Sequence, residues 1–272
     1  MISVSLTSQP GPVRQLMERT LADIVRDPGG EPGHRPDRLF DAVQLDARRQ
    51  FRAEEAGRTA RRELRHRLSE RGLSLSGLMF PLRGSLADPE RLDERIHAVQ
   101  QAMALAFDLG TRALVVPGGR VPEANSAESE RLADVIETIA RHGDRTGATL
   151  TLQIGSDGEA WNAWLSDVSQ AAPVAVQFDP AACVMSGQAM ERNLRALSDR
   201  VSQLRIRDGV SESRTSGREV TVGRGEVDFD LLAGMATELS ARPTLVIDPD
   251  AARPAELRQA VQFVRTVFTP AA

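Results

Sequence analysis

The sequence contains no lysine and no tyrosine, and Cys183 is the single cysteine among its 272 residues. Without lysine, the chain cannot form the Schiff base of an aldolase or a pyridoxal enzyme, carry a carbamylated lysine between two metal ions, or hold phosphate with a P-loop lysine. A tyrosine cannot serve as its general acid. One cysteine also excludes a disulfide framework and a four-cysteine zinc module within this sequence.

Long apolar runs are missing as well. No window approaches the roughly 18 apolar residues of a membrane-spanning helix, and the start of the sequence, MISVSL, lacks the basic region that opens a signal peptide. The composition, with 41% hydrophobic and 26% charged residues and a formal net charge of −4, is typical of a globular protein. We therefore expect a soluble, cytoplasmic protein that does not contact membranes.

Short apolar runs rich in β-branched residues alternate with longer stretches of helical periodicity. Successive runs begin about 25 to 45 residues apart, which leaves room for a strand, a helix and two loops. Parallel strands covered on both faces read as continuous apolar runs, as residues 113–116 (ALVV) do. The pattern predicts eight strands, at residues 2–6, 41–46, 73–80, 113–117, 149–154, 174–179, 201–207 and 244–248.

Between these runs, residues 92–109 and 129–142 show apolar side chains at helical spacing. Eight strand–helix units, with no change of composition along the chain, predict an α/β fold. We expect a single (β/α)₈ TIM barrel that covers residues 1–272. A doubly wound open sheet is the alternative. That fold usually carries a glycine fingerprint after its first strand, where this sequence reads TSQPGP.

Two stretches predict loops of more than connecting length. Residues 27–36 contain six prolines and glycines, and residues 209–225 are polar and glycine-bearing. The second stretch follows the seventh predicted strand, at the end of the barrel where active sites lie. It is either a lid over the site or an ordinary surface loop, and we leave both readings open.

The chemistry of a barrel collects at the carboxyl ends of its strands. The polar residues predicted there include no histidine; they are Asp46, Gln153, Asp179, Arg205, Asp208 and Asp248. Three nearby segments are distinctive: VQFDPAA (176–182), LRIRD (204–208) and VGRGEVDF (222–229). In that order they resemble the strand-six Asp-Pro-Gly-His, the strand-seven His-x-x-Asp and the Gly-x-Gly-x-(Val/Ile)-Asp-Phe turn of the xylose isomerase-like barrels, which include sugar isomerases, sugar epimerases and endonuclease IV-type repair enzymes.

The resemblance implies a divalent metal held by Glu, Asp, His and Glu from strands five to eight. The matching positions here are Gln153, Asp179, Arg205 and Asp248, while Gln44 stands in place of a strand-two Glu and Ala182 in place of a second His. Glutamine cannot act as a base, and a guanidinium has no lone pair for a metal. Only Asp179 and Asp248 are left as carboxylates for a Mn²⁺ or Mg²⁺ ion. We therefore expect a degraded metal site and no required cofactor.

We expect Arg205 to take the electrostatic role of the missing metal and to pair with Asp179 and Asp248. The resemblance then implies a sugar or sugar-phosphate isomerase or epimerase that moves a proton alpha to a carbonyl. Its ligand would be a small anionic sugar or a hydroxy-keto acid. The expected catalytic residues are Asp248, Arg205 and Gln153, and the expected substrate-binding residues are Arg205, Arg207, Asp208 and Gln44.

The alternative is that these charges only fill an abandoned pocket, so that the barrel is a catalytically inactive module that binds a small molecule or a protein. The sequence does not decide between these readings, and it leaves a homo-oligomer open.

A basic segment raises a third reading. Residues 48–71, predicted to form one helix, hold nine arginines against four glutamates and include one aromatic residue, Phe51. A solvated helix face explains this better than a nucleic-acid site. The endonuclease reading also needs clustered histidine ligands, whereas the four histidines are predicted in loops or helices: His34, His66, His97 and His142.

Three further side chains are expected to be structural. Trp161 and Trp164 lie three residues apart in a predicted helix, and this spacing favours a core stripe over a sugar-stacking wall. Cys183 follows the strand-six motif, yet no histidine is predicted beside it to generate a thiolate, so we expect an inert, packed thiol.

Overall fold

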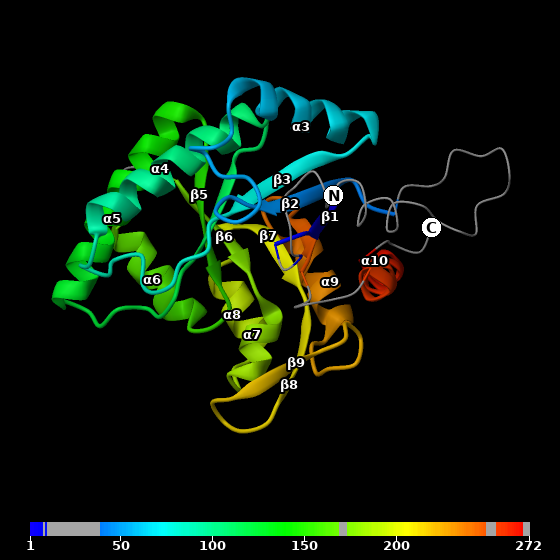
Figure 1. The fold of residues 1–272 in the computed structure, drawn as a ribbon. Helices are drawn as coiled ribbons and strands as arrows, with labels where there is room; N and C mark the ends of the chain where they lie inside the picture. Colours follow the sequence, from blue (N-terminus) through cyan, green and yellow to red (C-terminus); the bar gives the residue numbers. More distant parts are fainter. Residues whose placement is uncertain (8, 10–38, 169–172, 249–253, 269–272) are drawn as a thin grey trace, which may run out of the picture.

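Eight parallel strands close into a barrel in the computed structural model, which describes residues 1–7, 9, 39–168, 173–248 and 254–268 (Figure 1). The strands follow one another around the barrel in sequence order, and the last pairs with the first. The predicted (β/α)₈ barrel is confirmed, because each of the eight predicted runs contains one of these strands. They are β1 (Ile2–Ser5), β2 (Ala42–Asp46), β3 (Ser74–Met79), β4 (Ala113–Pro117), β5 (Thr149–Ile154), β6 (Val174–Phe178), β7 (Val201–Ile206) and β10 (Thr244–Ile247).

Helices cover the outside of the barrel, as Figure 1 shows, and bury one apolar face each against the strands. Helix α5 is the clearest case, because Ser126 caps its first turn by accepting a hydrogen bond from the Ser129 amide, and Gly147 ends it in the left-handed conformation. No described helix is long and apolar enough to cross a membrane. The helices are α3 (Arg58–Glu70), α4 (Leu92–Asp108), α5 (Ala127–Thr146), α6 (Gly158–Val168), α7 (Pro180–Met185), α8 (Met190–Ala196), α9 (Phe229–Glu238) and α10 (Pro254–Phe268).

The helix predicted at residues 48–71 is wrong over residues 48–57, because α3 begins only at Arg58. The carboxylate of Asp46 accepts hydrogen bonds from the backbone amides of Arg48 (2.7 Å) and Arg49 (2.8 Å), and this turns the chain away from β2. Such a local bond competes with helix formation. Gly57, in an extended conformation, then precedes the first residue of α3.

The prediction that residues 209–225 form a loop is also corrected, whereas the reading of this stretch as a lid stays a prediction. Residues Asp208–Ser211 form β8 and residues Gly217–Val220 form β9, an antiparallel hairpin that packs beside α7. Figure 1 shows the hairpin projecting from the barrel next to α7. The other predicted loop, residues 27–36, lies outside the described residues.

Asp208 fastens this hairpin to the segment that follows it. Its buried carboxylate accepts four backbone hydrogen bonds, from the amides of Gly209, Gly223, Gly225 and Val227, at 2.8 to 3.2 Å. Four donors on one carboxylate use most of its lone-pair sites. Asp208 was predicted to bind substrate, and that stays a prediction; in the structure its carboxylate is buried and bonded to these four amides.

Trp161, Trp164 and Cys183 lie in the core as expected. The Trp164 indole donates to Ser129 Oγ (2.8 Å), and its ring meets that of Trp161 edge to face. Burial and the nearby carboxylates of Asp179 and Asp157 raise the pKa of the Cys183 thiol to about 12, so the thiolate is disfavoured at neutral pH.

Gly143 in α5 provides a test of how closely the helices approach the barrel. A methyl group at this position would overlap the Ala148 carbonyl oxygen and the Met103 side chain. We expect Gly143→Ala to lower the free energy of unfolding by about 1–3 kcal/mol, measured by urea denaturation. Gly234→Ala in α9 is the matched control: nothing lies within 4 Å of its added methyl, so its helix propensity should raise stability by about 0.5–1 kcal/mol. Stabilisation by both substitutions would contradict the close packing of α5.

The anchoring role of Asp208 gives a second test. We expect Asp208→Ala to lower the free energy of unfolding by about 2–4 kcal/mol, because it strips the acceptor from four amides in a largely buried turn. Asp230→Ala, in the exposed first turn of α9, should change stability by less than about 0.5 kcal/mol. Equal effects of the two substitutions in urea denaturation would show that Asp208 does not hold the hairpin.

Candidate functional site

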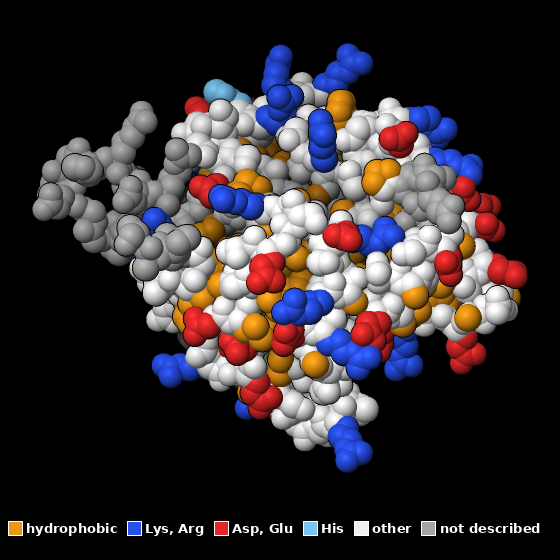
Figure 2. Space-filling model, turned by 180° about the vertical axis from the view of Figure 1, so that it is seen from behind, with side chains coloured by type: hydrophobic (Ala, Val, Ile, Leu, Met, Phe, Trp, Pro, Cys, Tyr) orange, Lys and Arg blue, Asp and Glu red, His pale blue; other side chains and the backbone are white. Residues whose placement is uncertain are grey.

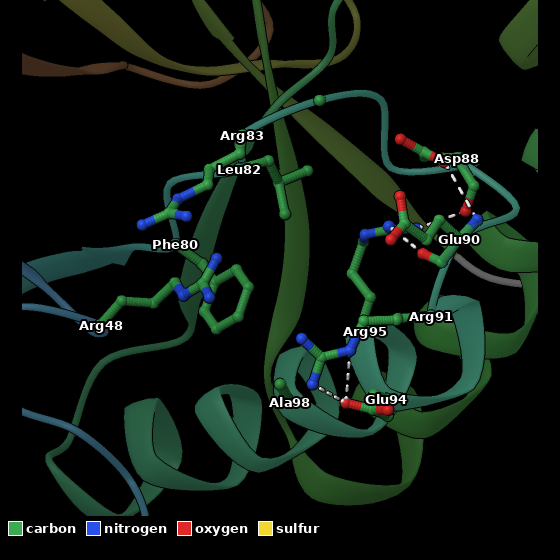
Figure 3. Close-up of a pocket in the computed structure, with 11 residues that line it drawn as sticks. Arg48, Phe80, Leu82, Arg83, Asp88, Glu90, Arg91, Glu94, Arg95 and Ala98 are labelled. Atoms are coloured by element: carbon green, nitrogen blue, oxygen red, sulfur yellow. Dashed lines mark hydrogen bonds and ion pairs between the residues drawn. The ribbon is translucent and has the colours of Figure 1, made fainter.

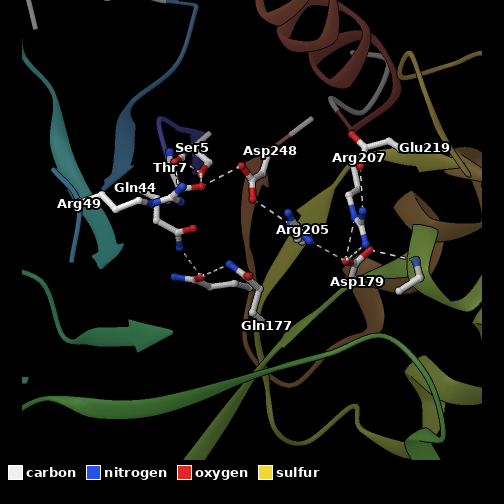
Figure 4. Close-up of polar contacts among 12 residues, drawn as sticks. Ser5, Thr7, Gln44, Arg49, Gln177, Asp179, Arg205, Arg207, Glu219 and Asp248 are labelled. Carbon is white, nitrogen blue, oxygen red and sulfur yellow. Dashed lines mark hydrogen bonds and ion pairs between the residues drawn. The ribbon is translucent and has the colours of Figure 1, made fainter. Parts of the chain in front are cut away.

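A buried arginine lies at the centre of the carboxyl end of the barrel. Arg205, on β7, donates from Nε to Asp248 Oδ2 (2.8 Å) and from Nη1 to Asp179 Oδ2 (3.0 Å) (Figure 4). The two aspartates directly follow the neighbouring strands β10 and β6, so the parallel register brings all three side chains to one level. The structure therefore brings together the three charged residues that the sequence predicted to pair.

Gln153, on β5, completes the contacts around this guanidinium. With its amide oxygen facing Arg205, it accepts hydrogen bonds from Nη1 (2.9 Å) and Nε (3.2 Å). A glutamate here would place a third negative charge beside the guanidinium, whereas the amide supplies only a partial one. The four residues at the positions implied by the resemblance are thus in one cluster.

A second arginine connects this cluster to the hairpin. Arg207 donates from Nη2 to Asp179 Oδ2 (2.7 Å) and from Nη1 to Glu219 Oε2 (2.8 Å) on β9. Asp179 also accepts the Ala182 amide (3.1 Å) and so caps α7. Asp179 therefore holds two guanidinium groups and a helix N-terminus, and the hairpin is linked to the barrel mouth through Arg207.

The charges of this network favour its ionised form. Burial opposes ionisation of Asp179, but the charges of Arg207 and Arg205 outweigh it and hold the pKa of that carboxyl below its usual range. Burial likewise opposes the charged form of Arg205, while Asp248 and Asp179 raise its pKa above the ordinary value. The network is therefore an ion-pair network at neutral pH. Arg205 keeps 15% of its side chain exposed, against 3% for each aspartate.

Smaller polar contacts extend the network toward β1 and β2. Thr7 donates to Asp248 Oδ1 (3.3 Å) and shares a hydrogen bond with Ser5 Oγ (2.9 Å). Asp46 accepts the side chain of Arg49 (2.5 Å), which also donates to the Thr7 carbonyl oxygen (3.1 Å). Asp248 and Asp46, the two acids at this edge of the mouth, therefore both have hydrogen-bond partners.

A layer of glutamines fills the barrel next to this cluster. Gln44 and Gln177 both donate to Gln203 Oε1, at 3.3 and 2.8 Å, and Gln203 donates to the Ser76 carbonyl oxygen (3.0 Å). The strand register shifts just before Gln44 and just before Gln177, and such bulges re-aim side chains. The side-chain oxygens of Gln44 and Gln177 are buried and have no hydrogen-bond partner among the residues that the structure describes. Gln44, predicted to bind substrate, thus lies in the interior.

The residues at the implied ligand positions do not suit a divalent metal. The Arg205 guanidinium lies between Asp179 and Asp248 and donates to one carboxylate oxygen of each. It therefore places a positive charge where a cation would bind. Within the described part of the chain, no group of three or more His, Cys, Asp or Glu side chains is placed to hold a metal ion.

Sequence reasoning missed Glu219 and the glutamine layer. Glu219 belongs to a stretch predicted as a loop, and only its antiparallel pairing with residues 208–211 brings it to Arg207. The glutamines of this layer lie one to a strand, on β2, β6 and β7, so nothing local marked them as a layer. His66, His97 and His142 lie on α3, α4 and α5, and His34 is outside the described residues.

The arginines of α3 lie on the outside of the barrel. Arg67 pairs with Glu63 (2.6 Å), and Arg61 pairs with Asp108 of α4. In Figure 2, basic side chains project at the top, the end that α3 covers in Figure 1, and both signs are interspersed over the rest of this face. This agrees with a solvated helix face.

Comparison with solved structures shows the same fold at low sequence identity. A xylose isomerase domain protein from Planctomyces limnophilus superposes with a TM-score of 0.79 at 17% identity, covering 98% of this chain and 97% of its own. A xylose isomerase-like TIM barrel protein from Mycobacterium smegmatis, solved with magnesium, gives 0.74 at 14%, covering 98% and 96%. D-psicose 3-epimerase from Clostridium cellulolyticum H10, solved with D-tagatose, gives 0.73 at 11%, covering 98% and 99%.

No curated protein matches the chain by sequence. The sequence profile of one family, however, matches residues 39–267, which is most of the chain and includes β2 to β10. The strand order and the three segments quoted above agree with that match. The chain belongs to the xylose isomerase-like TIM barrel family.

Proposed function

We propose that the chain is a metal-independent isomerase or epimerase-type protein that acts on a small sugar or hydroxy-keto acid at the carboxyl end of the barrel. One observation carries the proposal: the guanidinium of Arg205 lies between Asp179 and Asp248, where the family resemblance implies a divalent cation. A permanent cation in a partly buried site can stabilise negative charge that develops on a substrate oxygen.

The formal charge of the cluster supports this role. In the set implied by the resemblance, three carboxylates around a divalent cation leave a net charge of minus one. Here Asp179 and Asp248 around Arg205 also leave minus one, and Gln153 is neutral. With Gln in place of Glu at 153 and Arg in place of His at 205, the site therefore keeps the same formal net charge while it loses these two metal ligands.

In this proposal the reaction is a proton transfer at the carbon alpha to a carbonyl. Asp248 is the acid or base, Arg205 stabilises the enediolate oxygen, and Gln153 orients the guanidinium. Arg207 offers a second guanidinium to an anionic group of the ligand. The side chains of Arg205 and Arg207 are 15% and 12% exposed, whereas that of Asp179 is only 3% exposed.

A binding module without catalysis is the second candidate. The observation that favours it is that the carboxylates of Asp179 and Asp248 are both paired with Arg205, so a base at Asp248 must act from within an ion pair. Under this alternative, ligands of the same class bind at the mouth without any exchange of their protons.

Metal independence is tested by calorimetric titration of the chelator-treated protein with Mn²⁺ and Mg²⁺. We expect no stoichiometric binding by the native chain, because Arg205 occupies the ligand oxygens of both aspartates. The double variant Gln153→Glu/Arg205→His should gain a Mn²⁺ site, since it supplies a carboxylate and an imidazole in place of the amide and the guanidinium. One-site binding by the native chain that disappears in Asp179→Ala would contradict the proposal.

Catalysis is tested by proton NMR in D₂O with hydroxypyruvate, fructose and fructose 6-phosphate. We expect alpha-proton exchange with at least one of these compounds, and a loss of about 10²- to 10⁴-fold in Asp248→Asn, the size of effect typical of a general base. Asp230→Asn, on the exposed start of α9, is the matched control and should exchange at the native rate.

The same measurement separates the two candidates. Saturation-transfer NMR that detects binding of these compounds without exchange would favour the binding module. Exchange that persists at the native rate in Asp248→Asn would remove Asp248 from the proposed role.

A further inference from the structure

A separate pocket lies across the barrel from the Arg205 cluster. It has a volume of about 580 Å³ and is formed by the segment after β2, the segment after β3 and the first turns of α4 (Figure 3). β3 and β7 lie on opposite sides of the closed barrel, so this pocket does not share residues with the site described above. Its volume is in the range of sites for small organic ligands.

One side of the pocket is basic. The Arg48 guanidinium lies over the Phe80 ring, 5.2 Å from its centroid, and donates to the Pro81 carbonyl oxygen (3.1 Å). Arg83, exposed, extends to the same side, as Figure 3 shows. Among the described residues, neither Arg48 nor Arg83 forms an ion pair with a carboxylate. These two guanidinium groups therefore provide uncompensated donors next to an apolar surface that includes Leu82.

The opposite side of the pocket holds three carboxylates, those of Asp88, Glu90 and Glu94, and two guanidinium groups, those of Arg91 and Arg95, so its acids exceed its bases by one. Asp88 and Glu90 line it there, away from Arg48 and Arg83 in Figure 3. The third acid, Glu94 on α4, is paired with Arg91, the residue before that helix (3.0 Å), and so contributes little net charge. The pocket is therefore polar from end to end, with hydrogen-bond donors at one end and carboxylate acceptors at the other.

The loop that forms this pocket is held in place without a ligand. Arg95 reaches back from α4 and donates to the carbonyl oxygens of Leu86 (3.3 Å), Asp88 (2.6 Å) and Glu90 (2.7 Å). The Asp88 side chain accepts the Glu90 amide (3.0 Å). Residues bonded in this way lose little conformational freedom when a ligand arrives, which favours binding.

From these observations we infer a second ligand site, which binds a small organic molecule with a phosphate or carboxylate at one end and amino or hydroxyl donors at the other. The anionic group contacts Arg48 and Arg83, because guanidinium donors match the oxygens of both groups. The donor groups lie against Asp88 and Glu90. The two acids disfavour a ligand with anionic groups at both ends, and the basic end disfavours a simple cation.

Calorimetric titration with phosphoethanolamine, inorganic phosphate and ethanolamine tests this site. Phosphoethanolamine has the required charge at each end, and it is neither a sugar nor a keto acid. Binding of its phosphate at the barrel mouth through Arg207 would persist in Arg83→Ala, so that variant separates the two sites. We expect it to bind at one site and at least about fivefold more tightly than inorganic phosphate, and we expect no binding of ethanolamine.

Substitutions at each end give separate signatures. Arg83→Ala, at an exposed position, should weaken phosphoethanolamine and phosphate alike by about tenfold. The double variant Asp88→Asn/Glu90→Gln should leave phosphate binding in place and abolish the preference for phosphoethanolamine. Arg62→Ala, on the exposed face of α3, is the matched control and should bind as the native chain does.

Two outcomes would overturn the inference. One is native-like binding of phosphoethanolamine by Arg83→Ala and by Arg48→Ala, both checked for folding by circular dichroism. The other is the absence of binding by the native chain at concentrations up to about 10 mM.

Discussion

The ion pairs between Arg205 and the two aspartates are the interaction on which the carboxyl end of this barrel depends. A guanidinium that is mostly buried between strands is tolerated only when acceptors surround it, because an unpaired buried charge costs several kcal/mol. Asp248, Asp179 and Gln153 supply those acceptors from three different strand ends. Removing any one of them leaves a charge or a donor uncompensated, so these positions are constrained together.

The constraint reaches beyond the cluster through Asp179. The same carboxylate that pairs with Arg205 also pairs with Arg207 and caps α7, and Arg207 in turn binds Glu219 on the hairpin. Asp208, next to Arg207 in sequence, ties the hairpin to the turn before α9 through the amides of Gly223, Gly225 and Val227. The placement of β8 and β9 is thus set by buried charge at the end of β7. A ligand that changes the pairing of Arg207 would therefore act on the hairpin as well.

Much of this arrangement could be predicted from the sequence, and the rest shows where such prediction ends. The eight strands follow from local apolar runs. The pairing of Arg205 with Asp179 and Asp248 was expected from the family resemblance together with the rule that parallel strand ends meet at one edge. Glu219 could not be placed because a polar hairpin has no apolar alternation, and its position depends on pairing with residues 208–211. The start of α3 was misplaced because the Asp46 side chain competes for the amides of the first predicted turn.

Under the proposed function, a guanidinium in place of a divalent ion, together with glutamine in place of glutamate at 153, keeps the formal charge of the cluster but changes what the charge can do. A metal ion can bind two substrate oxygens at once and can exchange its ligands, whereas a guanidinium acts through N–H donors confined to one plane. Asp248, Asp179 and Gln153 already fix that plane. The site therefore suits a substrate that places one oxygen, rather than two, against the cation. In the proposed reaction, the outcome depends on how the substrate carbon beside that oxygen is presented to Asp248, which is paired with the same guanidinium.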